Sequence, residues 1–215
     1  MSLSAVRLLG RSVIALLAFA MLTGTASAQL VEGKNYIRLP NPQPVETGNK
    51  IEVVEFFSYG CPHCAALEPY LDKWLATLPP DVAFHRVPVM FHSDWVQLAK
   101  VYYTLDAMGQ VKLSPDVFKA IHETGTRLSD KKTFLDWAAS KGLDRKKVEE
   151  VFDSFAIDGR IKRAMQLAQE YRIQSVPSVI VDGKFITSSD RVGTHANLPA
   201  AIDELIAKAR AERKS

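Results

Sequence analysis

The sequence EFFSYGCPHC at residues 55–64 decides the fold, and it contains both cysteines of this 215-residue chain, Cys61 and Cys64. The apolar run 51–57 predicts a strand that is buried on both faces, and the residues from 65 to about 78 predict a helix. A Cys-x-x-Cys between a strand and a helix is typical of reversible thiol–disulfide exchange. Because there is no third cysteine, any intramolecular disulfide must join this pair.

The remaining elements follow in a simple order along the chain. A second strand is expected at 82–89, and the pattern from 93 to about 171 is helical throughout. Short strands at 179–181 and 184–186 flank an Asp-Gly pair, which is a strong β-hairpin signal. A final helix is expected at 197–211. This order predicts an α/β fold in which an all-helical domain is inserted into a β-sheet domain.

The predicted boundaries place the sheet domain at 29–90 and 171–215 and the helical insertion at 91–170. Within the insertion, Ser114 is expected to cap a helix whose first position is Pro115. Apolar residues recur at helical spacing in each predicted helix, and we expect them to face the core. They include Tyr70, Phe155 and Met165.

The first 28 residues have the three parts of a secretory signal peptide. Arg7 and Arg11 give a positive start, 13–22 is an apolar run, and 26–28 is an Ala-x-Ala cleavage pattern. A membrane anchor is the alternative, but the run is shorter than the roughly 20 residues that span a bilayer. We therefore expect a mature chain that starts at Gln29, and a secreted protein can hold a disulfide.

The charge balance argues against a nucleic-acid surface. The chain has 27 lysines and arginines against 24 acids, a formal net charge of +3. Cleavage of the signal peptide would remove Arg7 and Arg11 and no acid, which lowers the net charge from +3 to +1. The remaining basic residues alternate with acids, so we expect no nucleic-acid partner.

The cysteine pair could also belong to a metal site or a haem site. Zinc could use both cysteines with a distant histidine, but no second Cys-x-x-Cys and no His-x-x-x-His completes four ligands. The candidate histidines are His85, His92 and His195. A c-type haem needs His directly after the second cysteine, where this chain has Ala65. We therefore expect no metal and no cofactor.

The two cysteines should differ in reactivity. Cys61 lies at the start of the predicted helix, where unpaired N–H groups and the helix dipole stabilise an anion. Pro62 suits the first turn, because its missing N–H is not needed there. His63, when protonated, adds positive charge near the Cys61 sulfur. Cys64 lies about one turn deeper, so Cys61 is expected to attack and Cys64 to resolve the mixed disulfide.

The segment 55–64 closely resembles the active site of the DsbA family of periplasmic thiol:disulfide oxidoreductases. Its Pro-His dipeptide is fairly specific, since thioredoxin-like reductases usually carry Gly-Pro there. The similarity extends to the helical insertion, to Ser175-Val176-Pro177 and to the mature length. It implies a thioredoxin-like fold and a disulfide donated to reduced secreted proteins. It also implies reoxidation by a DsbB-like quinone reductase in the membrane.

The resemblance also implies roles for residues outside the cysteine motif. Val176 and Pro177 match a cis-proline loop that pairs with an extended substrate, although Pro177 could simply enter a strand. Glu55 matches a buried acid that relays protons to Cys64, although it could instead reach solvent. The family's paired lysine is Arg86 here, and arginine cannot release a proton at ordinary pH. Residues 188–195 match the family poorly.

Three functions stay open from the sequence alone. The resemblance favours a dithiol oxidase whose disulfide passes to clients through a mixed disulfide at Cys61. A reductase or isomerase would need a more stable disulfide, and envelope isomerases usually carry a dimerisation domain for which the segment 29–49 is too short. A binding module or metallochaperone would bind metal through both cysteines. We see no sign of an obligate oligomer and expect a monomer.

Overall fold

The computed structural model describes residues 29–214, so the predicted signal peptide at 1–28 lies outside the described residues. Its sheet has five strands in the order β1-β5-β4-β2-β3. Strand β2 pairs in parallel with β3 and antiparallel with β4, while β5 pairs antiparallel with both β4 and β1. The strands are β1 (Ile37–Arg38), β2 (Ile51–Phe57), β3 (Val82–Pro88), β4 (Ser178–Val181) and β5 (Phe185–Thr187).

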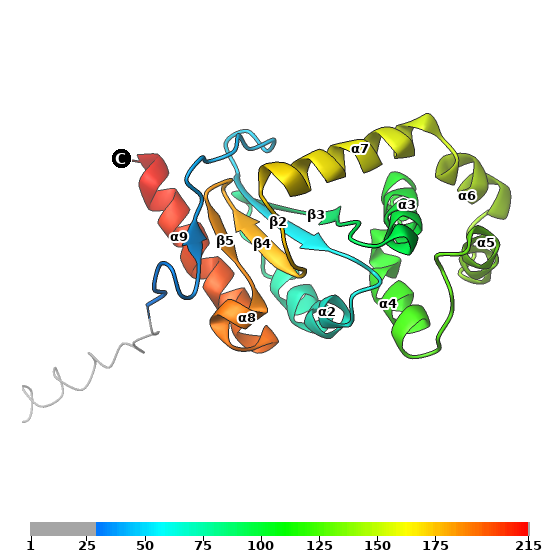
Figure 1. The fold of residues 1–215 in the computed structure, drawn as a ribbon, viewed down its shortest axis with the longest axis horizontal. Helices are drawn as coiled ribbons and strands as arrows, with labels where there is room; N and C mark the ends of the chain where they lie inside the picture. The colour runs from blue at the N-terminus through cyan, green and yellow to red at the C-terminus, as the bar shows by residue number, and fades with distance from the viewer. Residues whose placement is uncertain (1–28, 215) are drawn as a thin grey trace, which may run out of the picture.

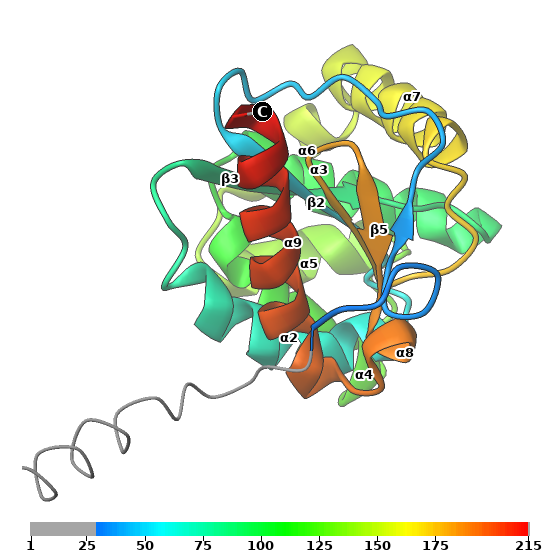
Figure 2. The same ribbon diagram turned by 90° about the vertical axis from the view of Figure 1, so that its left-hand side faces the viewer.

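The central strand β2 is buried along its whole length, as its mostly apolar sequence predicted. Helices α2 (Pro62–Leu75) and α9 (Leu198–Lys214) pack against the sheet, and Figures 1 and 2 show α9 running alongside it. Buried apolar side chains of both helices join those of the strands in one core cluster. The short helices α8 (Ser189–Val192) and η2 (His195–Asn197) lead into α9.

Five helices lie between β3 and β4 and form the other half of the molecule (Figure 1). They are α3 (Ser93–Ala107), α4 (Ser114–His122), α5 (Lys131–Ser140), α6 (Arg145–Phe152) and α7 (Phe155–Glu170), with the short η1 (Val111–Leu113) before α4. Their apolar faces form a second core cluster that continues into Phe57 of β2. The sheet and the helices together make the α/β architecture expected from the sequence, while the domain boundaries stay a prediction.

Aspartate caps two helices of the helical half, whereas the predicted serine cap is absent. Asp130 and Asp144 cap α5 and α6 by accepting a backbone N–H bond from the residue three positions on. Ser114 is not a cap: Leu113 holds that position, and Ser114 is the first residue inside α4. Its buried hydroxyl binds a tyrosine of the other half instead of its own helix, which explains the error.

Three apolar side chains that were expected in the core are exposed: Tyr70 by 40%, Phe155 by 94% and Met165 by 50%. Phe155 is the first residue of α7, so it lies at the end of the helix and not along its packed face. Tyr70 and Met165 lie at the edges of their apolar stripes. Among residues 29–214, no helix is long and apolar enough to cross a membrane.

Candidate active site

The cysteine motif lies where β2 turns into α2. Cys61 occupies the N-cap position with extended backbone angles, and Pro62 follows in the first turn. The carbonyl of Cys61 accepts backbone N–H bonds from Cys64 and Ala65, both at 3.1 Å. The Cys61 thiol is therefore held beside the N-terminal end of the helix dipole, the arrangement that favours a thiolate.

Both cysteines are free, buried thiols, but their acidities differ sharply. The pKa of Cys61 is lowered to about 6, mainly by a hydrogen bond from the Cys64 thiol. Backbone N–H groups and the charge of His63 lower it further, against the opposing effect of burial. Burial is also the main reason why the pKa of Cys64 is raised, and the Glu55 carboxylate adds to that rise. Cys61 is thus the thiolate of the pair at neutral pH.

The loop before β4 closes the site from the opposite side. The Val176–Pro177 peptide bond is cis, as the resemblance predicted. The Cys61 sulfur lies 3.5 Å from the Val176 carbonyl oxygen. Val176 is half-buried, whereas Pro177 is buried directly before β4. A main-chain carbonyl therefore stands next to the sulfur that a substrate thiol would approach.

A buried group of three charges lies behind the cysteines. Arg86 of β3 donates from Nε to Glu55 of β2 at 2.7 Å. Its two terminal nitrogens bind both carboxylate oxygens of Glu68 of α2, at 3.1 and 2.8 Å. Glu55, Glu68 and Arg86 are 1%, 4% and 7% exposed. A bidentate arginine–carboxylate pair of this kind is both directional and strong.

This group holds one positive charge and two carboxylates, so Arg86 neutralises only part of their negative charge. Burial raises the pKa of Glu55, against the opposing effect of Arg86. Burial likewise raises the pKa of Glu68 to about 7. The two carboxylates together keep the pKa of Arg86 above its ordinary value despite its burial. Glu68 can therefore hold a proton near neutral pH.

Glu55 and Arg86 are predicted from the sequence, whereas Glu68 is not. Glu68 lies four positions after Cys64 and one after Leu67, on the buried face of α2. An acid inside the apolar stripe of a helix needs a buried partner, and that spacing was a usable signal. Only the packing of α2 against β3 shows that the partner is Arg86.

Two histidines lie beside the cysteine motif. His63 is exposed, and its ring lies 6.2 Å from that of His195, measured between centroids. The His63–His195 contact places the poorly matched stretch 188–195 beside the cysteine motif. Within that stretch, His195 Nδ1 lies 2.7 Å from Ser189 Oγ. Across residues 29–214, no group of three or more histidines, cysteines or acids could hold a metal ion.

A five-stranded mixed sheet, a Cys-x-x-Cys at a helix N-terminus and a cis-proline opposite it define a thioredoxin-fold disulfide oxidoreductase. Residues 79–198 match the family model of the DSBA-like thioredoxin domain. The thiol:disulfide interchange protein DsbA of Bordetella parapertussis is 42% identical over 91% of this chain and 96% of its own length. DsbA of Pseudomonas aeruginosa PAO1 is 38% identical over 93% and 96%.

Solved structures agree with the sequence relatives. The crystal structure of Pseudomonas aeruginosa DsbA superposes with a TM-score of 0.83 at 38% identity, covering 86% of this chain and 97% of that one. The oxidoreductase NmDsbA1 of Neisseria meningitidis gives a TM-score of 0.78 at 30% identity, covering 89% and 100%. The chain belongs to the DsbA family of thiol:disulfide interchange proteins, and it is an enzyme that acts on disulfides.

Proposed function

We propose that this protein is a dithiol oxidase that donates the Cys61–Cys64 disulfide to newly secreted proteins. The observation that carries the proposal is the placement of Cys61 at the N-terminus of α2, with Cys64 buried one turn deeper. A stabilised Cys61 thiolate stabilises the reduced enzyme, so the disulfide form becomes a strong oxidant. The same arrangement would disfavour a reductase, which needs the more stable disulfide.

The reaction proceeds through two thiol–disulfide exchanges. A client thiolate attacks the Cys61 sulfur, the Cys61–Cys64 bond breaks, and Cys64 leaves and takes up a proton. The client's second thiolate then attacks its own sulfur in the mixed disulfide, and Cys61 leaves as a thiolate. The client loses two electrons and gains a disulfide, while the enzyme gains those two electrons as a dithiol.

Glu55 is proposed to exchange the proton of Cys64 during these steps. Its carboxyl has a raised pKa, and its charge acts on Cys64. A carboxyl of this kind can release a proton as Cys64 becomes a leaving group and recover it during reoxidation. Arg86 holds Glu55 by a hydrogen bond but cannot itself release a proton at ordinary pH. Its role in the relay is therefore to keep Glu55 in position.

The client is proposed to bind as an extended chain along the cis-proline loop. The Val176 main chain lies next to the Cys61 sulfur, and a β-like pairing there would bring any client cysteine to the sulfur. Main-chain recognition of this kind depends little on the amino-acid sequence of the client, which suits an enzyme with many clients. Pro62 and His63 border the same approach on α2.

The cellular setting is proposed from the signal-peptide pattern and the family. The mature protein would act as a monomer in the periplasm, and a DsbB-like membrane quinone reductase would reoxidise it. Each turnover leaves Cys61 and Cys64 reduced, so the activity requires such an oxidising partner.

The proposal is tested by the direction in which the disulfide is transferred between this protein and a peptide. The oxidised mature protein is mixed without oxygen with an equal amount of a reduced peptide that carries two cysteines. The proposal predicts one peptide disulfide for each protein dithiol formed, detected by alkylation and mass spectrometry. If the peptide stays reduced, and the reduced protein instead opens the disulfides of insulin rapidly, the protein is a reductase.

A further inference from the structure

The turn that delivers the chain to Cys61 is held together by bonds of its own. The Cys61 N–H donates to the Ser58 carbonyl at 3.1 Å, which closes a four-residue β-turn. The Gly60 N–H donates to the Ser58 hydroxyl, also at 3.1 Å. The peptide between Tyr59 and Gly60 is therefore the central peptide of this turn.

The central peptide has two available orientations, because Gly60 is a glycine. The φ of Gly60 lies outside the left-handed region, as in a type I turn. A type II turn would reverse the central peptide and require positive φ at Gly60, which glycine adopts easily. Position 60 also has no room for a side chain, because a Cβ on Gly60 would lie 2.4 Å from Nε1 of Trp95.

A histidine of the helical half binds this peptide from outside the turn. His122, the last residue of α4, lies with Nε2 2.8 Å from the Tyr59 carbonyl oxygen. A carbonyl only accepts hydrogen bonds, so Nε2 must carry the hydrogen. The His122 ring stacks on Phe118 of the same helix, with 6.2 Å between centroids. Reversing the central peptide would turn the carbonyl away and break this bond.

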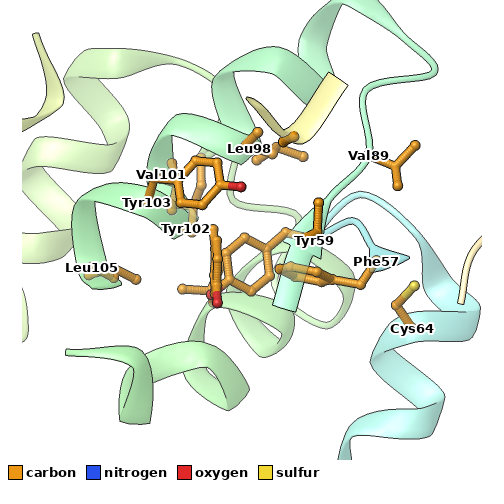
Figure 3. Close-up of a cluster of buried hydrophobic side chains, with 14 of the residues drawn as sticks. Phe57, Tyr59, Cys64, Val89, Leu98, Val101, Tyr102, Tyr103 and Leu105 are labelled. Carbon is orange, nitrogen blue, oxygen red and sulfur yellow. The ribbon is translucent and has the colours of Figure 1, made fainter. Parts of the chain in front are cut away.

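The side chain of Tyr59 is held by the same helix. Its hydroxyl lies 2.7 Å from the hydroxyl of Ser114, the first residue of α4. Its ring makes an edge-to-face contact with Phe57, as Figure 3 shows, and another with Phe118. The Tyr59 side chain is 1% exposed. The two ends of α4 therefore bind the hydroxyl and the carbonyl of one residue, two positions before Cys61.

We propose that His122 is a positioning residue that fixes the Tyr59–Gly60 peptide and thereby the setting of Cys61 at the start of α2. Ser114 supports it by fixing the Tyr59 side chain. Without the His122 bond, the bond from the Gly60 N–H to the Ser58 hydroxyl is left to hold the central peptide in this orientation, and the Cys61 sulfur is held less well against the helix N-terminus. This assignment rests on the proposed function, in which Cys61 is the attacking thiol.

Two substitutions at one position separate hydrogen bonding from packing. His122→Leu fills similar space but cannot donate, whereas His122→Gln keeps an N–H donor. Thiolate absorbance against pH gives the Cys61 pKa, and glutathione buffers give the equilibrium between dithiol and disulfide. We expect His122→Leu to raise the Cys61 pKa and weaken the oxidant about two- to fivefold, the size of a modest hydrogen bond. His122→Gln should recover most of that change.

The outcomes distinguish a loss of folding, a failure of the His122 assignment and a failure of the proposed function. Thermal unfolding first establishes that the variants are folded, and Ser114→Ala provides a second disturbance of Tyr59 if His122→Leu does not fold. An unchanged titration and glutathione equilibrium in His122→Leu would overturn the proposal, as would equal shifts in the leucine and glutamine variants. If the native protein itself shows no Cys61 thiolate below pH 8, the proposed function fails and not merely this assignment.

Discussion

The sheet half and the helical half of the molecule bury very different side chains. In the sheet half, with α2 and α9, five charged residues are buried: Glu52, Glu55, Glu68, Arg86 and Asp182. In helices α3 to α7, the buried polar side chains among the described residues are the neutral Thr104 and Ser114. The buried charges near the Cys61–Cys64 pair therefore come from one half, and the other half contributes packing and the contacts of α4 with the turn at residues 58–61.

The largest effect should come from removing either cysteine. Cys61→Ala removes the sulfur that a client attacks, so turnover should fall to background. Cys64→Ala removes the group that resolves the intermediate, so mixed disulfides with clients should accumulate at Cys61. Non-reducing gels and mass spectrometry of the adducts measure both results. Full oxidase activity in Cys61→Ala would contradict the assignment of the site.

The buried charges of the sheet half provide the second test. Arg86→Met leaves Glu55 and Glu68 without their cation, and breaking a buried ion pair in this way costs about 3–5 kcal/mol. Urea unfolding at pH 7 measures the loss. The loss should shrink at acidic pH, because the two carboxyls can then take up protons.

A surface pair is the matched control for Arg86. Arg210 binds Asp81 with two hydrogen bonds, but both side chains are partly exposed. Arg210→Met should therefore change the free energy of unfolding by only about 0–1 kcal/mol. Equal losses in the two variants would show that burial does not set the strength of the Arg86 group.

The titration of Cys61 gives a smaller effect with a defined sign. The folded-state pKa, about 6, lies below the unfolded value of about 8.5. The thiolate therefore stabilises the reduced protein fully above pH 8.5, and that stability is lost as pH falls through 6. At pH 7 it amounts to roughly 1.4 kcal/mol relative to the unfolded chain.

Comparing the reduced and oxidised proteins isolates this contribution, because both contain Glu55, Glu68 and Arg86. The stability difference between the two forms should fall by roughly 1 kcal/mol between pH 7 and pH 5. In His63→Ala, the thiolate absorbance should titrate at higher pH, since the charge of His63 helps to lower the Cys61 pKa. If His63→Ala left the titration unchanged, His63 would have no part in lowering the Cys61 pKa.

The smallest effect is expected on the outer surface of the helical half. Phe155 is almost fully exposed, so Phe155→Ser should change the free energy of unfolding by less than about 0.5 kcal/mol. Phe152, three residues earlier, is 3% exposed, and Phe152→Ala should cost about 3–5 kcal/mol. A large loss in Phe155→Ser would reveal packing that this structure lacks around that ring.

The sequence predicted what depends on local patterns. The buried strand β2, the helix that starts at Pro62, the Asp182-Gly183 turn and the cis bond at Pro177 all follow from short stretches of chain or from the family motif. Glu68 and His122 were not identified, and Ser114 was predicted only as a cap, because polar residues on amphipathic helices are usually solvated. Their partners come from other elements, and only the packed structure brings them together.

The most direct test of the account is the reduction potential of the Cys61–Cys64 pair in glutathione buffers. A stabilised Cys61 thiolate predicts a reduction potential far above that of a thioredoxin-like reductase, which is about −270 mV. The protein would then be mostly reduced in buffers that leave thioredoxin oxidised. A value near or below that of thioredoxin would contradict the claim that the Cys61–Cys64 disulfide is made to be donated.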